Sequence, residues 1–264
     1  MKVGFIGCGN MGQAMLAGML DSGKISESNI VVSAKTASTK EKLEKQYMVH
    51  IAQQNIDVVR EADYIFLAVK PQYYEDILAE IRSAITEQTV LISIAPGKTF
   101  AWLQEKVGKP CKIVRTMPNT PSLVKEGMMG ICGNDRVSAS ELKAVCDLCS
   151  GFSRTEIVTE NLMDVVTAVS GSSPAYVFMF IEAMADAAVE GGMPRQQAYT
   201  FAAQAVLGSA KMVLDTDMHP GQLKDMVCSP GGTTIQAVRV LEEQGMRAAV
   251  MDAMKACLDK SRNM

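Results

Sequence analysis

The stretch Gly7-Cys8-Gly9-Asn10-Met11-Gly12 decides the fold of this chain. Its three glycines have GxGxxG spacing and directly follow a short apolar run at residues 2–6. Residues 10–21 then repeat apolar side chains at helical intervals. A GxGxxG turn between a strand and a helix is typical of a domain that binds a dinucleotide.

Each position of this turn has a physical role in holding a pyrophosphate. Gly7 permits the tight turn, Gly9 lets the backbone approach the phosphates, and Gly12 lets the helix pack closely on the strand. The helix N-terminus offers unpaired N–H groups and the positive end of its dipole. We therefore predict that Gly7, Gly9, Asn10, Met11 and Gly12 bind the cofactor.

Strand-like and helix-like segments alternate up to about residue 160. The strand-like runs are 30–33, 64–69, 90–94 and 112–116, and the helix-like segments between them include 39–46 and 73–85. Segments 128–132 and 155–158 are expected to add edge strands around a helix at 140–149. This alternation predicts an α/β fold in which residues 1–160 form a parallel, doubly wound Rossmann sheet.

The pattern changes after Glu160, where strand signals end. Helices are expected at 161–169, 175–191, 195–215 and 233–260, which makes residues 161–264 an all-helical domain. These helices are apolar almost all round, so they must be buried. In so short a domain the burial is expected to include another copy of the chain, which predicts self-association.

Composition excludes several classes of protein. The chain has 264 residues, 48% of them hydrophobic, and a net charge of −3, so it has no basic footprint for nucleic acid or membrane. The most membrane-like stretch, 175–181, is far shorter than the ~20 apolar residues of a span. The seven cysteines are scattered and odd in number, which favours a reduced cytoplasmic protein. Cys146 and Cys149 form an isolated CxxC, so no metal site is predicted.

The end of the second strand distinguishes NADP from NAD. An acidic residue here would bind the ribose 2′-hydroxyl of NAD, but the segment reads Val32-Ser33-Ala34-Lys35-Thr36. Ser33, Lys35 and Thr36 can instead donate to a 2′-phosphate. We predict that NADPH is preferred and that NADH is possible; alternatively, Lys35 is an ordinary surface lysine.

Three loops follow strands of the expected sheet. They are Ala68-Val69-Lys70-Pro71, residues 93–97 with Ala95, and Met117-Pro118-Asn119-Thr120-Pro121. Ligands of such sheets bind at the carboxyl ends of the strands, so these loops are expected to line the nicotinamide half of the cleft. Plain loop chemistry is the alternative for each.

A second glycine-rich turn lies in the helical half, at Ser229-Pro230-Gly231-Gly232-Thr233-Thr234, before a helix at 235–243. The amides of Gly232, Thr233 and Thr234 suit a carboxylate or a phosphate. The alternative is that the threonine hydroxyls cap the helix.

Several segments together resemble the pyrroline-5-carboxylate reductase family. They are 7–12, 68–71, 117–121, Ser170-Gly171-Ser172-Ser173-Pro174-Ala175-Tyr176, and 219–234 followed by Leu241-Glu242. The resemblance runs essentially end to end. It implies reduction of 1-pyrroline-5-carboxylate to L-proline with NAD(P)H, the last step of proline biosynthesis. It also implies a Rossmann domain followed by a helical dimerisation domain, with the active site where the cofactor domain meets helices of both subunits.

The resemblance also implies roles for individual residues. Thr234 would be the catalytic hydroxyl nearest the imine nitrogen, and Asn55 would contact the cofactor. The substrate-binding residues would be Glu160, Val227, Ser229, Gly231, Gly232, Thr233 and Thr234. Reduction of a protonated imine requires no metal, cysteine nucleophile or histidine base.

Two rival functions are a β-hydroxyacid dehydrogenase and a noncatalytic NADP-binding regulator. The dehydrogenases use a helix-borne lysine with an asparagine one turn later. Lys211 and Lys224 are the candidates, but Asp215 and Cys228 stand four residues on. The glycine turn, the nicotinamide loops and the carboxylate turn together argue against a regulator.

Overall fold

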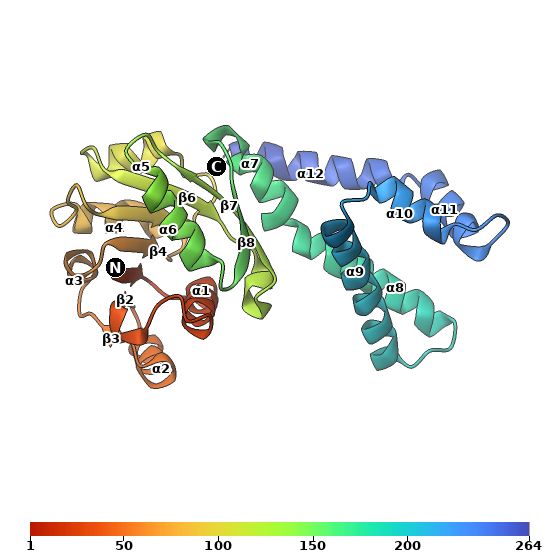
Figure 1. The fold of residues 1–264 in the computed structure, drawn as a ribbon, viewed down its shortest axis with the longest axis horizontal. Coiled ribbons are helices and arrows are strands. Elements are labelled where there is room, and N and C mark those ends of the chain that lie inside the picture. Colours follow the sequence, from red (N-terminus) through yellow and green to blue (C-terminus); the bar gives the residue numbers. More distant parts are fainter. Residues whose placement is uncertain (264) are drawn as a thin grey trace. The chain divides into compact units, whose positions relative to one another are not determined.

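A computed structural model describes residues 1–263, and its N-terminal half is built on one eight-stranded sheet (Figure 1). The strand order is β3-β2-β1-β4-β5-β6-β7-β8. The strands are β1 Val3–Ile6, β2 Ile30–Ser33, β3 His50–Ile51, β4 Tyr64–Leu67, β5 Val90–Ser93, β6 Lys112–Met117, β7 Gly127–Gly133 and β8 Ser153–Ile157. The order reverses direction at β1, as in a doubly wound Rossmann sheet, which confirms the predicted fold class.

One strand pair departs from the expected parallel arrangement. Strand β7 pairs with β6 antiparallel, with Arg115 opposite Cys132, whereas β7 and β8 are parallel. The reason is the connection at 118–126, which contains only the short 3-10 helix Thr120–Val124. Because a parallel crossover needs a dozen or more residues, this segment can only reverse the chain.

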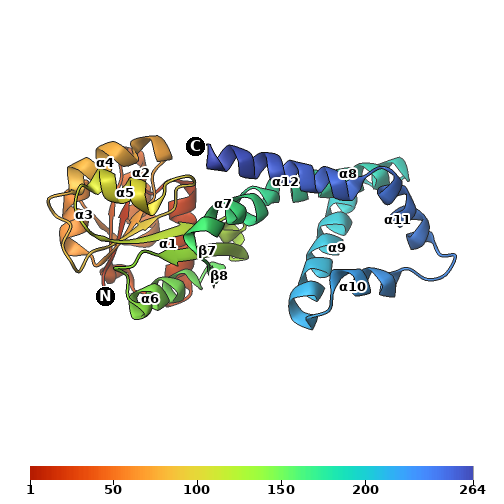
Figure 2. The same cartoon turned by 90° about the horizontal axis from the view of Figure 1, so that it is seen from above.

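Helices cover both faces of the sheet (Figure 2). On one face lie α1 Asn10–Asp21, α2 Ala37–Tyr47 and α6 Ala139–Cys149, whose residues Met15, Leu43 and Leu148 share a core with one side of the strands. On the other face lie α3 Asn55–Glu61, α4 Tyr74–Ile81 and α5 Phe100–Val107. Every residue of β1, β2 and β5 is buried, as the continuous apolar runs require.

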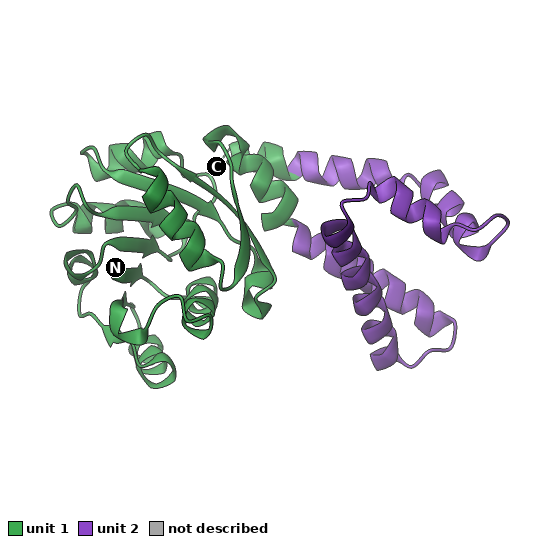
Figure 3. Ribbon diagram, in the orientation of Figure 1, with its two compact units in different colours: residues 1–172, 257–264 green, residues 173–256 purple. Residues whose placement is uncertain are grey.

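The chain divides into two compact units (Figure 3). The first comprises residues 1–172 and the chain from residue 257 on, and the second comprises residues 173–256. The division falls later than the predicted boundary at Glu160 because the intervening segment is bonded to the first unit. Glu160 binds Arg115, and the Ser170 carbonyl accepts from Asn119.

The segment after β8 is less regular than the helix expected at 161–169. A 3-10 turn, Glu160–Leu162, leads into the α7 turn Met163–Val166 and then into a π-helical turn, Thr167–Gly171. Thr167 and Ser170 donate their hydroxyl groups to the carbonyls four residues back. Such π turns occur mostly within α-helices, frequently at functional sites.

The second unit is entirely helical. It contains α8 Ser173–Glu190, α9 Arg195–Thr216, α10 Pro220–Val227, α11 Thr233–Glu243 and most of α12 Met246–Arg262. The single helix expected at 233–260 is therefore wrong. The chain turns at Gly245, whose φ of +73° favours glycine and ends the first helix.

The helical stretch at 160–190 is long and apolar enough to cross a membrane, judged by length and composition alone. The expectation that no segment reaches such a length was therefore too strict. Only 11% of its most apolar window is buried within the structure.

Candidate active site

The three glycines of the first turn differ in their surroundings. Gly7 has φ +74°, and a Cβ built there would lie 2.3 Å from Val69 Cγ1. A Cβ at Gly12 would lie 3.1 Å from that of Ala68, so helix α1 and the end of β4 approach closely. A Cβ at Gly9 would meet nothing within 4 Å. The open space beside Gly9 is where a pyrophosphate would approach the backbone.

Helix α1 has no side-chain cap at its N-terminus. Gly9 is the N-cap residue and makes no side-chain hydrogen bond to the first turn. The amides of the first turn have no acceptor within a helix, and the helix dipole is positive at this end. The turn therefore has the features of an anion site, as the sequence predicts.

A cavity of about 710 Å³ opens beside this turn. The predicted cofactor residues that line it are Gly7, Gly9, Ser33, Lys35, Thr36, Asn55, Ala68, Val69 and Lys70. Five others do not line it: Asn10, Met11, Gly12, Pro71 and Ala95. Thr39, Lys40, Tyr73 and Glu80 line it as well and were missed by sequence reasoning. Thr39 and Lys40 sit in the first turn of α2, so the polar run after β2 could have revealed them.

Polar side chains at the end of β2 are linked by short hydrogen bonds. Ser33 donates its hydroxyl to Asn55 Oδ1 at 2.7 Å, and Asn55 Nδ2 donates to Glu80 Oε2 at 2.7 Å. Lys35 Nζ lies 5.5 Å from the centroid of the Tyr73 ring, within cation–π range. Lys35 therefore lies at the cavity wall, and its ring contact does not consume its hydrogen-bond donors.

A buried tyrosine joins two of the loops expected to face the nicotinamide. Tyr74 is fully buried and donates to the carbonyl of Leu67, the last residue of β4, at 2.7 Å. Its hydroxyl also accepts from the amide of Ile94, just after β5, at 3.2 Å. Burial raises the pKa of Tyr74 to about 12, so the group stays protonated. Tyr74 is thus a structural clamp that sequence reasoning missed.

The third loop is joined to the π-helical turn. Asn119 is buried, and its Nδ2 donates to the Ser170 carbonyl at 3.1 Å. Its Oδ1 accepts from the amide of Met128 at 2.9 Å. One side chain therefore ties the predicted 117–121 loop to the start of β7 and to the Ser170 segment named in the resemblance.

The second glycine-rich turn lies within the helical unit and leads into α11. Gly231 has φ +67°, and Gly232 is the N-cap residue, without a side-chain cap bond. Threonine capping is therefore not seen. The Gly232 amide donates to the Ser229 carbonyl at 3.0 Å, so it is engaged within the turn. The amides of Thr233 and Thr234 lie in the first turn, where a helix provides no acceptor.

The remaining predicted substrate residues fall in two places. Val227 ends α10 and is exposed, and Ser229 follows it in the same turn. Glu160 lies in the first unit instead. Its Oε1 accepts from the Phe100 amide at 2.6 Å and from Arg115 Nη1 at 2.8 Å.

The cysteines are free thiols, and burial disfavours the thiolate form of several of them. Burial raises the pKa of Cys8 to about 12, and it raises those of Cys146 and Cys149 in the CxxC. A redox-active pair needs the opposite shift. Across residues 1–263, no three His, Cys, Asp or Glu side chains are grouped to hold a metal ion.

Comparison with known proteins matches both halves of the chain. Residues 160–264 match the family described as pyrroline-5-carboxylate reductase dimerisation. Residues 2–97 match the family described as NADP oxidoreductase, coenzyme F420-dependent. The second match agrees with the Rossmann domain, and the first agrees with a helical domain that self-associates.

Full-length relatives agree with these matches. The pyrroline-5-carboxylate reductase of Escherichia coli K12 is 51% identical, over 100% of this chain and 98% of its own length. The structure of a Coxiella burnetii pyrroline-5-carboxylate reductase superposes with a TM-score of 0.94 at 32% identity, covering 99% of this chain and 97% of its own. The structure of a Plasmodium falciparum pyrroline carboxylate reductase with NADP bound superposes with a TM-score of 0.90 at 35% identity. The match covers 100% of this chain and 97% of that one. These similarities favour the predicted reductase over a β-hydroxyacid dehydrogenase, and this chain belongs to the pyrroline-5-carboxylate reductase family.

Proposed function

We propose that this protein reduces 1-pyrroline-5-carboxylate to L-proline with NAD(P)H. The observation that carries the proposal is full-length similarity to reductases of that name, at 51% identity for the Escherichia coli enzyme. Two uncapped helix N-termini, at Gly9 and Gly232, agree with it, because the reaction needs one site for a pyrophosphate and one for a carboxylate.

The residues of the second turn account for substrate binding. The amides of Thr233 and Thr234 hold the carboxylate at the positive end of α11. The Thr234 hydroxyl orients the imine nitrogen and can pass a proton to it. When bound, the nicotinamide supplies the hydride. The positive nitrogen of the substrate makes its own carbon electrophilic, so placement provides much of the catalysis.

NADPH is proposed as the preferred cofactor. Lys35, Thr39 and Lys40 line one part of the cavity and can donate to a 2′-phosphate. The hydroxyls of Thr36 and Ser33, which also line it, already donate to Thr39 Oγ1 and Asn55 Oδ1 at 2.7 Å each. The Plasmodium falciparum relative was solved with NADP bound. Glu80 also lines the cavity, but it already accepts from Asn55.

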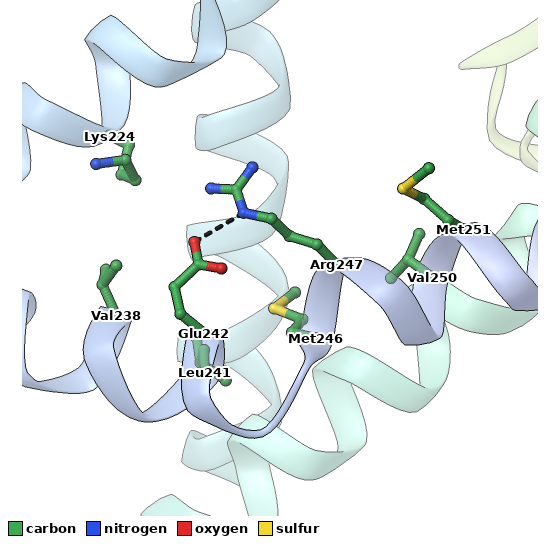
Figure 4. A pocket seen from close by; sticks show the side chains of 8 residues that line it. All are labelled: Lys224, Val238, Leu241, Glu242, Met246, Arg247, Val250 and Met251. Atoms are coloured by element: carbon green, nitrogen blue, oxygen red, sulfur yellow. Dashed lines mark hydrogen bonds and ion pairs between the residues drawn. The ribbon is translucent and has the colours of Figure 1, made fainter.

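Self-association is proposed to cover the apolar surface of the helical unit. The unit's buried apolar residues are only Ala185, Ala198 and Ala202, whereas Phe178, Met179 and Phe201 are more than 60% exposed. A pocket of about 490 Å³ lies within this unit, over α10, α11 and α12 (Figure 4). Its wall is mostly apolar, with one ion pair between Arg247 and Glu242 at 2.7 Å.

A cytoplasmic location remains the prediction of the sequence.

One assay tests the proposed reaction. Purified protein is mixed with NADPH or NADH and with 1-pyrroline-5-carboxylate or a panel of small β-keto acids, and oxidation of the cofactor is followed at 340 nm. We expect oxidation with 1-pyrroline-5-carboxylate, formation of proline and a higher kcat/KM for NADPH. Oxidation with a β-keto acid alone would replace the proposal with a dehydrogenase, and no oxidation with any substrate would favour a regulator.

A further inference from the structure

One carboxylate oxygen joins three segments at the end of the sheet. Arg115, on β6, is only 5% exposed, and its Nη1 donates to Glu160 Oε1 at 2.8 Å. The same oxygen accepts from the backbone amide of Phe100 at 2.6 Å. Glu160 begins the 3-10 turn that leads into α7, and Phe100 begins α5. All three segments belong to the first compact unit.

The position of Phe100 gives this junction its importance. Phe100 follows the loop 94–99, which carries Ala95, a predicted cofactor residue that does not itself line the cavity beside the glycine turn. A carboxylate is favourable at a helix N-terminus, because the first amides lack acceptors and the dipole is positive there. Thr99 also caps this helix, accepting from the Trp102 amide at 3.1 Å. The C-terminal end of the loop is therefore held at two adjacent residues.

This junction of Arg115, Glu160 and the Phe100 amide is not well explained by a contribution to stability alone. The Arg115 Nε atom is buried and has no hydrogen-bond partner among residues 1–263. The Arg115 guanidinium is removed from water, whereas the Glu160 side chain stays 36% exposed, so the cost of desolvating Arg115 offsets part of the attraction between the two charges. A charged residue in an otherwise buried strand is therefore better explained by the geometry that it imposes.

We propose that Arg115 and Glu160 are positioning residues for hydride transfer, which fix the 94–99 loop through the Phe100 amide. This inference rests on the proposed function, because it takes the loop to face the nicotinamide. The family resemblance implies that Glu160 contacts the substrate. In this proposal Glu160 acts instead through the backbone amide of Phe100. Neither side chain touches a reacting atom.

The chain offers a matched control pair on the same strand. Lys112, three residues before Arg115, forms an ion pair with Glu141 at 2.6 Å, and both side chains are about 20% exposed. This pair joins β6 to α6 and touches none of the predicted cofactor loops. Lys112→Met and Glu141→Gln therefore report what the loss of a partly buried ion pair does to stability and kinetics without disturbing the 94–99 loop.

The test compares Glu160→Ala, Arg115→Met, their double variant and the two control variants. For each, thermal melting, kcat, the KM for both substrates, and the kinetic isotope effect with NADPH deuterated at C4 are measured. We expect kcat to fall about tenfold in both single variants, because a small misplacement of the reacting groups is costly. The KM for 1-pyrroline-5-carboxylate should stay within about threefold, and the isotope effect should rise as hydride transfer becomes slower. The double variant should be no slower than the singles, because both act through one junction.

Three results would overturn the inference. The first is kcat within twofold of wild type in both single variants, as expected of the control pair. The second is a raised KM for 1-pyrroline-5-carboxylate at unchanged kcat in Glu160→Ala alone, which would mean direct substrate contact. If the alanine variant does not fold, Glu160→Gln replaces it, because glutamine keeps an acceptor for the Phe100 amide. The third result is then a normal kcat and a normal isotope effect in both Glu160→Gln and Arg115→Met. Absence of activity in the wild type would instead reject the proposed function.

Discussion

At the residue scale, Gly7 and Gly9 should respond differently to the same substitution. Gly7→Ala places a Cβ at positive φ, 2.3 Å from Val69 Cγ1, so we expect the free energy of unfolding to fall by about 1–2 kcal/mol or more. Gly9→Ala meets no atom within 4 Å and should cost less than about 1 kcal/mol. It should nevertheless weaken NADPH binding at least about tenfold by blocking the backbone approach of the pyrophosphate. Urea unfolding and fluorescence titration with NADPH separate the two effects.

Thr234 carries the proposed chemical role of the second turn. Thr234→Ala removes the hydroxyl near the imine nitrogen and should lower turnover at least about tenfold, or ~1.4 kcal/mol of transition-state stabilisation. Thr233→Ala is the control, because Thr233 is proposed to act through its backbone amide. Steady-state kinetics with saturating NADPH measure both variants. Normal turnover in Thr234→Ala would remove this residue from the mechanism.

Lys35 is the residue that tests whether the segment after β2, which lacks an acidic residue, recognises the 2′-phosphate of NADPH. Lys35→Ala should lower kcat/KM for NADPH about tenfold while leaving that for NADH nearly unchanged, because only NADPH carries the 2′-phosphate. The Tyr73 ring that lies under the ammonium is the competing partner. Equal loss with both cofactors would mean that Lys35 supports the cavity wall through that ring and does not recognise the phosphate.

At the scale of elements, the sequence predicted helices and strands best where an apolar pattern and a turn residue indicate the same boundary. Helix α1 lies at 10–21 as expected, and the four buried strands β1, β2, β4 and β5 follow from their apolar runs. Strand β3 and the short helices α3, α5 and α10 were missed, because a two-residue edge strand and helices of seven or eight residues carry too little periodicity. The break at Gly245 was missed, although a glycine after the polar run Glu242-Glu243-Gln244 is a signal for a helix end.

The candidate site was only partly readable for a related reason. The glycine turns could be found because their spacing is local. Tyr74 bonds to Ile94, 20 residues on, and Arg115 bonds to Glu160, 45 residues on, so no local pattern contains these contacts. The one available signal was Arg115 itself, a charged residue within the predicted strand at 112–116, since buried charges are normally paired.

Helix α6 offers a test of a cap and an ion pair that share one carboxylate. Glu141 accepts from the Ser138 amide at 2.9 Å in a capping box and from Lys112 at 2.6 Å. Burial opposes ionisation of Glu141, but these hydrogen bonds outweigh it and lower its pKa. A lowered pKa in the folded state gives stability that is present above the unfolded value of about 4.3 and is lost as pH falls below it.

We therefore expect the free energy of unfolding to fall less steeply between about pH 5 and 3 in Glu141→Gln than in wild type. Ser138→Ala should cost about 1 kcal/mol at neutral pH through loss of the cap. Urea unfolding at a series of pH values measures both changes. Parallel pH profiles for wild type and Glu141→Gln would show that the carboxylate gains nothing from its partners.

At the scale of the whole molecule, the two compact units differ in how they bury apolar side chains. The first packs two continuous cores against its sheet, whereas the second buries three alanines and leaves large side chains on α8 and α9 in solvent. Exposed apolar surface of this extent is a mark of an interaction site. The match of residues 160–264 to a dimerisation family agrees with the proposal that a second copy of the chain covers this surface.

Assembly should therefore be sensitive to charge on the helical unit and insensitive to it elsewhere. Phe201, on α9, is 65% exposed, and burying such a side chain contributes about 1.5–3 kcal/mol, whereas an arginine there would have to be buried as a charge. We expect Phe201→Arg to shift the solution mass toward that of the 28.5 kDa chain. Leu123→Arg, at 62% exposure in the first unit, is the control and should leave the mass unchanged. Light scattering coupled to gel filtration measures both, and an unchanged mass for Phe201→Arg would place the self-association surface away from this face of α9.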